Sequence, residues 1–304
     1  MRPSNRLFAL IGVVFVAACS GVAPTPTPSR TPSPALPSPT ASPSPSATAS
    51  PSGAPSTSPS DLPAAVAVIK IEQTPGFIAP STTFNRYPTV VLYGDGRLIM
   101  LGPQVEMYPG PALPNLQVTH ITPAGVQQLL AWAADAGLEG EDRLLGPAIP
   151  DAGVTQFSVV QPDGPHMTTV GDMSSDLPEV GALRKFQDIM LDVRSWIPTE
   201  VVGDDVAYDY DRLRVLVMPA TPADAPDPSL VSVVDWPLDA SLARIGAPAA
   251  VEVPARCAEI TGADLATVKP AMEQANELTL WRSDGQTYSV KPHPLLPGEE
   301  ACPA

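Results

Sequence analysis

The stretch TVVLYGDGRLIML, residues 89–101, decides the fold class of this chain. Residues 89–93 are β-branched and apolar, which is typical of a strand, and residues 97–101 form a second run of the same kind. The Gly-Asp-Gly between them supplies the positive φ angles of a tight turn. We therefore expect an antiparallel hairpin at this point of the chain.

Further strand and helix signals lie on both sides of this hairpin. Residues 66–71 (VAVIKI) predict another strand. Thr122 followed by Pro123 predicts the start of a helix, because Thr caps the first turn and Pro fits the first helical position. Apolar residues at helical spacing predict a second helix over residues 177–196.

A second set of elements is expected in the C-terminal third. Residues 212–218 and 230–234 predict strands. Thr261 and Asp264 have the spacing of a capping box that opens a further helix. Pro270 is expected to kink or split that helix, because proline removes a backbone hydrogen bond.

Hairpins are expected twice more, at Asp163-Gly164 and at Asp284-Gly285, each after a predicted helix. Both halves thus contain strands, a helix and a hairpin, through duplication or through chance. Runs of strands with isolated helices predict an α+β fold, with antiparallel sheets and packed helices. The two expected strand-strand-helix-hairpin units are residues 62–202 and 203–304.

The N-terminus has the pattern of an export signal. Two arginines precede the apolar run of residues 7–18, which spans only ~18 Å as a helix and is too short for a ~30 Å hydrocarbon core. Residues 1–18 therefore predict a secretory signal peptide. The sequence Val-Ala-Ala-Cys at residues 16–19 resembles the lipobox of bacterial lipoproteins, which implies cleavage after Ala18 and acylation of Cys19. An ordinary signal peptide with an incidental cysteine is the alternative.

Residues 19–61 predict a lipidated cysteine followed by a disordered tether. Residues 21–60 contain 12 Pro, 11 Ser, 6 Thr and 6 Ala, and their one charged residue is Arg30. Such a composition cannot bury enough apolar surface to offset the entropy of ordering. We expect acyl chains on Cys19 to hold the protein in the lipid bilayer, on the extracytoplasmic face of the cell membrane.

Charge limits the partners of the folded part. All 32 Asp and Glu follow residue 60, together with 14 of the 17 Lys and Arg, which gives this part a net charge of −18. Such a charge repels phosphate backbones and anionic headgroups, so nucleic acid is not expected as a partner.

The C-terminal region carries a second resemblance. Arg256-Cys257, the hairpin at Trp281 and the sequence PLLPGE at residues 294–299 are similar to uncharacterised lipoproteins and secreted proteins of high-GC bacteria. The resemblance covers roughly the last fifty residues and implies no activity.

The cysteine count predicts a disulfide. With Cys19 acylated, Cys257 and Cys302 remain as a pair in a compartment where thiols oxidise. A metal site formed by both cysteines and His293 is the alternative, but it lacks a fourth ligand and the usual close spacing.

The densest group of carboxylates lies in residues 203–211. Asp205, Asp209 and Asp211 are candidate Ca²⁺ ligands, because hard cations need several oxygens from one loop. A solvated acidic linker that holds no cofactor is the alternative.

Common catalytic motifs are missing from the sequence, and His120, His166 and His293 lie far apart in it. We therefore nominate no catalytic residue. The expected function is that of a non-enzymatic binding or interaction module for an unknown protein or glycan partner. The alternatives are a hydrolase of cell-wall or extracellular polymers, with a site assembled from dispersed residues, and a protein inhibitor.

Overall fold

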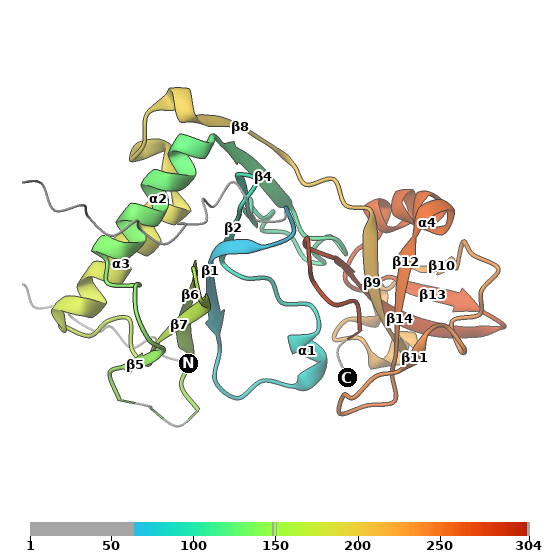
Figure 1. Cartoon of the computed structure of the whole chain (residues 1–304). Coiled ribbons are helices and arrows are strands. Elements are labelled where there is room, and N and C mark those ends of the chain that lie inside the picture. The colour runs from blue at the N-terminus through green and yellow to red at the C-terminus, as the bar shows by residue number, and fades with distance from the viewer. Residues whose placement is uncertain (1–63, 148, 150, 303–304) are drawn as a thin grey trace, which may run out of the picture. The chain divides into compact units, whose positions relative to one another are not determined.

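The hairpin predicted at residues 89–101 lies in the middle of an eight-stranded sheet (Figure 1). Its strands are β2 (Val90–Tyr93) and β3 (Arg97–Leu101), which pair antiparallel. Gly96 in the turn has φ +88°, and a Cβ there would lie 2.0 Å from the Ile121 carbonyl oxygen, so only glycine fits.

The computed structural model describes residues 64–147, 149 and 151–302.

The first sheet has the strand order β5-β7-β6-β1-β2-β3-β4-β8. Its neighbours pair antiparallel except β5 and β7, which are parallel. The remaining strands are β1 (Ala67–Thr74), β4 (Leu116–Ile121), β5 (Arg143–Leu145), β6 (Val154–Gln161), β7 (Gly164–Val170) and β8 (Val202–Ala207).

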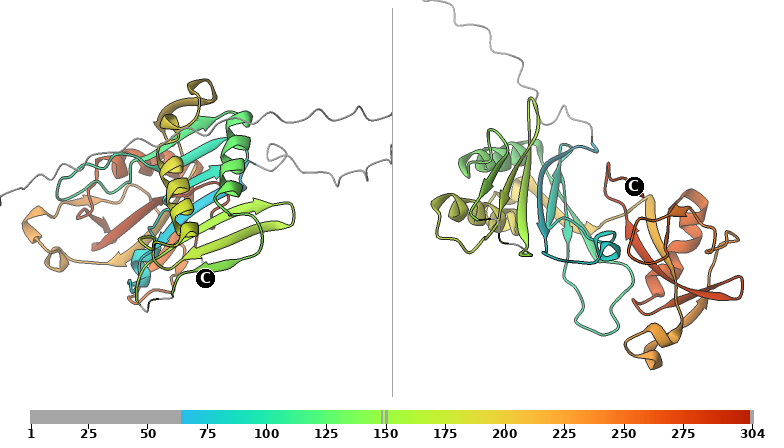
Figure 2. Two further views of the ribbon diagram at one scale, coloured as in Figure 1. Left: turned by 90° about the vertical axis from the view of Figure 1, so that its left-hand side faces the viewer. Right: turned by 90° about the horizontal axis from the view of Figure 1, so that it is seen from below.

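Two helices, α2 (Pro123–Asp135) and α3 (Pro178–Leu191), cover one face of this sheet (Figure 2). The Thr122 hydroxyl accepts a hydrogen bond from the Gly125 amide, so the predicted N-cap is confirmed. The predicted second helix is shorter than expected, because α3 ends at Leu191 and a 3₁₀ turn, Val193–Ser195, follows. The apolar faces of both helices pack on the sheet in one core.

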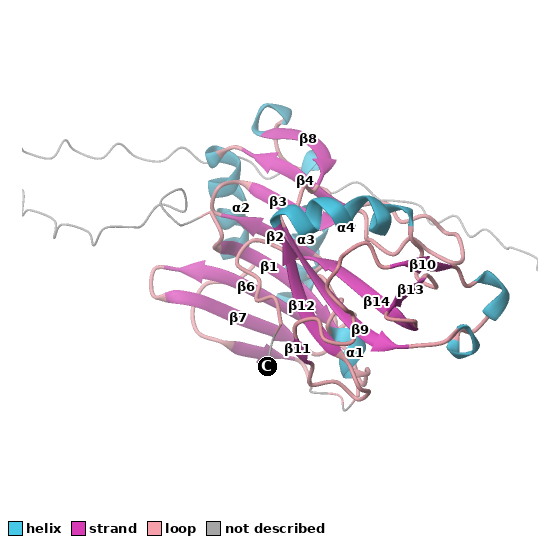
Figure 3. Ribbon diagram, turned by 90° about the vertical axis from the view of Figure 1, so that its right-hand side faces the viewer, coloured by secondary structure: helices cyan, strands magenta, loops and turns pink. Residues whose placement is uncertain are grey.

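The second sheet has the order β10-β13-β14-β9-β12-β11, and α4 (Gly262–Gln274) packs on it (Figure 3). Its neighbours are antiparallel except β10 and β13. Its strands are β9 (Arg212–Pro219), β10 (Val233–Asp235), β11 (Ala247–Pro248), β12 (Arg256–Thr261), β13 (Leu280–Ser283) and β14 (Gln286–Pro294). Short 3₁₀ turns lie at Thr199–Val201, Pro222–Asp224 and Pro228–Leu230.

One expectation for α4 is wrong. Thr261 is the N-cap residue, but its side chain makes no capping hydrogen bond, so the capping box does not form. Pro270 lies inside α4 and does not split it, and the alternative, a kink at Pro270, stays a prediction.

Apolar side chains from each half of the fold pack against the sheet of the other half. Phe84, after the short helix α1 (Pro80–Thr83), packs with Leu216 and Cys257 of the second sheet. Leu296, after β14, packs with Val91 and Tyr93 of the first. The core formed by α2 and α3 takes Val90 and Leu92 from β2, and because side chains alternate along a strand, Leu296 covers the opposite face. The described residues of both α+β units therefore belong to one compact unit.

The acidic segment 203–211 is not only a linker. Its first half belongs to β8, which pairs with β4 and places Val206 opposite Val118. The first sheet thus extends past residue 203, the expected start of the second unit. The two halves also differ in topology: β6, the first strand of its hairpin, pairs with β1, whereas β14, the second strand of its hairpin, pairs with β9. Duplication stays a hypothesis.

Candidate binding pocket

A pocket of about 640 Å³ lies beneath the loop of residues 248–255, which we call the loop pocket. Val217 of β9 and Tyr288 of β14 line it from the second sheet, and the buried Leu242, between β10 and β11, lines it as well. The loop itself contributes Val251, Val253 and neighbouring Ala and Pro side chains. Glu252 and Arg256 add polar groups to this lining. Pockets of this volume that combine apolar surface with a few polar groups accept small organic molecules.

Helix α1 holds the loop in place. The Ser81 amide donates to Oε2 of Glu252 at 2.9 Å, and the Ser81 hydroxyl donates to Oε1. These hydrogen bonds lower the pKa of the Glu252 carboxyl, which keeps the carboxylate charged. Phe84 packs against Ala255 at the other end of the loop.

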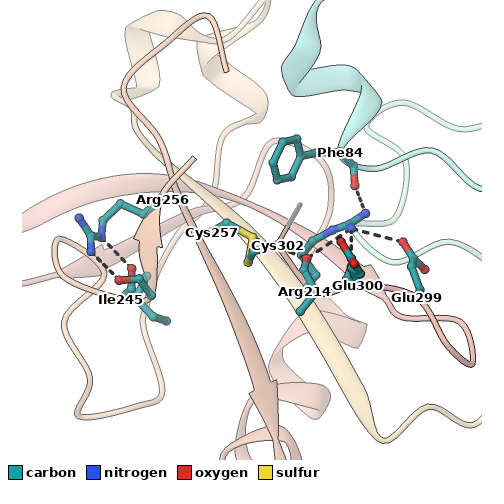
Figure 4. The surroundings of a disulfide bond; sticks show 10 residues. Phe84, Arg214, Ile245, Arg256, Cys257, Glu299, Glu300 and Cys302 are labelled. Carbon is teal, nitrogen blue, oxygen red and sulfur yellow. Dashed lines mark hydrogen bonds and ion pairs between the residues drawn. A yellow bond between two sulfur atoms is a disulfide. The ribbon is translucent and has the colours of Figure 1, made fainter. Parts of the chain in front are cut away.

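Arg256 shapes another wall of the loop pocket (Figure 4). Its Nε donates to the Ile245 carbonyl at 2.7 Å, and its Nη2 donates to the Gly246 carbonyl at 2.6 Å. Gly246 has φ +54°, and a Cβ there would lie 1.9 Å from the Cys257 carbonyl oxygen. Because Arg256 and Glu252 already have protein partners, the arrangement is suited to taking up an apolar group.

A disulfide joins Cys257 to Cys302, with 5.8 Å between their Cα atoms (Figure 4). This separation lies within the range that a disulfide requires. Cys257 is buried in β12, next to the wall of the loop pocket, and Cys302 lies in the C-terminal segment. The bond therefore ties the end of the described chain to the second sheet.

A cluster of three ionisable side chains, Arg214, His293 and Glu299, lies beside the disulfide. Glu299 Oε1 is 2.9 Å from His293 Nε2 and 3.3 Å from Arg214 Nη1. The Arg214 guanidinium also donates to the carbonyls of Phe84, Glu300 and Ala301, so it joins the first half of the fold to the C-terminal segment (Figure 4).

His293 is fully buried, and its ring stacks on Tyr87 with 4.1 Å between centroids. Burial lowers the pKa of His293, although the hydrogen bond to Glu299 opposes this. Burial alone would raise the pKa of Glu299, but the hydrogen bond from His293 and the nearby charges hold it below its usual value. The hydrogen bond between His293 Nε2 and Glu299 fits a neutral ring that carries its proton on Nε2 and donates it to the carboxylate.

The candidate Ca²⁺ ligands do not converge. Asp205 is bound to Arg194 at 2.8 Å and to the Thr119 hydroxyl, and Asp209 is bound to Lys269 at 2.9 Å. The hydrogen bonds from Arg194 and Thr119 lower the pKa of Asp205. Within the part of the chain that the structure describes, no three His, Cys, Asp or Glu form a group that would hold a metal ion. The Ca²⁺ site stays a prediction.

The other residues singled out in the sequence are not part of the loop pocket as the described residues form it. Cys19 and the tether lie outside the described residues. His120 is exposed on β4, and His166 on β7 pairs with Asp163 at 2.9 Å. Neither these two nor His293 lines the loop pocket.

Two features of the site were not foreseen from the sequence. The loop of residues 248–255, PAAVEVPA, is a mostly apolar run with neither helical nor strand periodicity, and that combination is the available signal for the loop pocket. No sequence pattern indicates the pairing of His293 with Glu299. The residues that surround this pair, Arg214 and Tyr87, come from distant parts of the chain.

Comparison with protein-family models, with curated proteins and with solved structures finds no match to this chain. None of the helices in residues 64–302 that the structure describes is long and apolar enough to cross a membrane.

Proposed function

We propose that this protein is a membrane-anchored extracytoplasmic lipoprotein and that its folded part is a non-enzymatic module that binds a small apolar ligand in the loop pocket. The observation that carries the proposal is the lining of this open pocket of about 640 Å³, where Val, Leu, Pro and Ala residues predominate beside Tyr288, Glu252 and Arg256. The folded part has a net charge of −18, which repels anions but not an uncharged ligand.

The anchor part of the proposal rests on the lipobox at Cys19. We expect Cys19→Ala to release the protein from membranes or to leave it as a precursor that keeps residues 1–18, because the acylated thiol is lost. Membrane fractionation with intact-mass measurement checks this, and Ser20→Ala is the matched control. Unchanged membrane retention, with a mature N-terminus elsewhere, would contradict the anchor.

The binding part is tested with the neutral fluorescent probe N-phenyl-1-naphthylamine. We expect saturable binding to the wild type and about tenfold weaker binding to Val253→Asp, because the new carboxylate must be desolvated when the probe enters. Val253 is 42% exposed, so the substitution should leave the fold intact.

Val105→Asp is the matched control for this titration. Val105 is 63% exposed between β3 and β4 and does not line the loop pocket, so its variant should bind the probe like the wild type. Equal affinities of the wild type and Val253→Asp would contradict the proposed function and would favour the hydrolase or the inhibitor alternative.

A further inference from the structure

A second pocket, of about 690 Å³, lies at the end of the first sheet where β1 and β7 end and β6 begins. Its lining includes Thr74, Pro75, Val154 and Met173, together with Arg86. We call it the Arg86 pocket. It has no lining residue in common with the loop pocket.

Arg86 differs from the other arginines. Ten arginines lie among the described residues, and eight of them have side-chain hydrogen bonds or ion pairs with the described protein. Arg86 and Arg244 have none there, and Arg244 is exposed, whereas Arg86 is half-buried in the pocket. A guanidinium that is partly removed from water and lacks a counter-charge favours an anion beside it.

The backbone that lines the Arg86 pocket leaves no room for a side chain at two glycines. A Cβ on Gly153 would lie 2.9 Å from the Thr74 carbonyl oxygen, and one on Gly171 would lie 2.4 Å from the Pro147 carbonyl oxygen. Both glycines line the pocket, and a side chain at either one would force the neighbouring backbone to shift. The one carboxylate in the lining, Asp172, accepts hydrogen bonds from the Ser174 amide and hydroxyl at 2.8 and 2.7 Å.

We propose that the Arg86 pocket binds a small monocarboxylate with a hydrocarbon body. The planar guanidinium matches a carboxylate with two parallel hydrogen bonds. Pro75, Val154 and Met173 supply apolar surface for the rest of the molecule. A single negative charge is favoured over a polyanion, because the net charge of −18 repels multiply charged ligands.

Octanoate is the probe, and octanol is its uncharged counterpart. Calorimetric titration of the wild type should show octanoate binding that is about tenfold tighter than octanol binding, since only the carboxylate pairs with Arg86. The amide resonances of Gly153 and Gly171 should shift when octanoate is added. No octanoate binding, equal binding of both compounds, or shifts confined to the loop pocket would overturn the proposal.

Arg86→Gln and Arg244→Gln remove the same charge from the two arginines whose side chains have no partner among the described residues. We expect Arg86→Gln to weaken octanoate binding about tenfold or more and Arg244→Gln to leave it unchanged. Equal effects of the two variants would mean that only net charge matters and would overturn the site. Because Val253→Asp should leave octanoate binding intact, failure of this proposal is distinguishable from failure of the loop pocket.

Discussion

Replacing Cys257 and Cys302 together with alanine will lower the free energy of unfolding by up to about 4 kcal/mol. The disulfide closes a loop with a sequence separation of 45 residues, so its loss frees many conformations of the unfolded chain. It also frees the C-terminal segment whose carbonyls, at Glu300 and Ala301, bind Arg214. Urea denaturation of the oxidised wild type and of the double variant measures the difference.

Dithiothreitol is the control for this result. Reduction should destabilise the wild type by a similar amount and leave the double variant unchanged. Equal stabilities of the oxidised wild type and the double variant would contradict the structural role assigned to the bond.

Glu299→Ala will lower the free energy of unfolding by about 3 kcal/mol at pH 7, because Arg214 then stays buried without its counter-charge. The side chain of Arg214 is only 5% exposed, but that of Glu299 is 28% exposed. The expected loss of stability therefore lies at the lower end of the range for breaking a buried ion pair. Glu300→Ala is the matched control. Glu300 is exposed and offers only its backbone carbonyl to Arg214, so its variant should change stability by about 0.5 kcal/mol or less.

The pH dependence of the free energy of unfolding gives a second test of the same variant. The pKa values of His293 and Glu299 both lie below their ordinary values of 6.5 and 4.5, so the unfolded chain binds more protons and stability falls as pH falls. The wild type should lose stability below about pH 6.5 through His293, and below about pH 4.5 through Glu299 as well. The gap between the wild type and Glu299→Ala should therefore narrow below pH 4.5. A gap that is constant from pH 7 to 3, or equal effects of Glu299→Ala and Glu300→Ala, would contradict the ion pair.

The hairpins and α2 could be predicted because their signals are local. Asp95-Gly96, Asp163-Gly164 and Asp284-Gly285 each set a turn, and Gly96 and Gly285 have positive φ as the turn requires. The strands β4 and β12 were not predicted, since LQVTHI and RCAEIT mix polar and apolar residues without clear alternation. Their pairing with β3 and β9 decides their structure, and that pairing is non-local.

The candidate site was predictable only at its cysteines. Counting thiols in an oxidising compartment selects Cys257 and Cys302 without knowledge of the fold. The cluster around Glu299 depends instead on Arg214 of β9 and Tyr87 of the first half, which only the folded chain brings to His293. The loop pocket likewise needs α1 to hold Glu252, through a hydrogen bond between residues 171 positions apart.

Intermolecular nuclear Overhauser effects between N-phenyl-1-naphthylamine and the methyl groups of the protein test the central claim most directly. The account predicts contacts from the naphthyl protons to Val251, Val253 and Leu242, the side chains that line the loop pocket. Contacts confined to methyl groups elsewhere, or no contacts at saturating probe, would contradict a binding module built on this pocket.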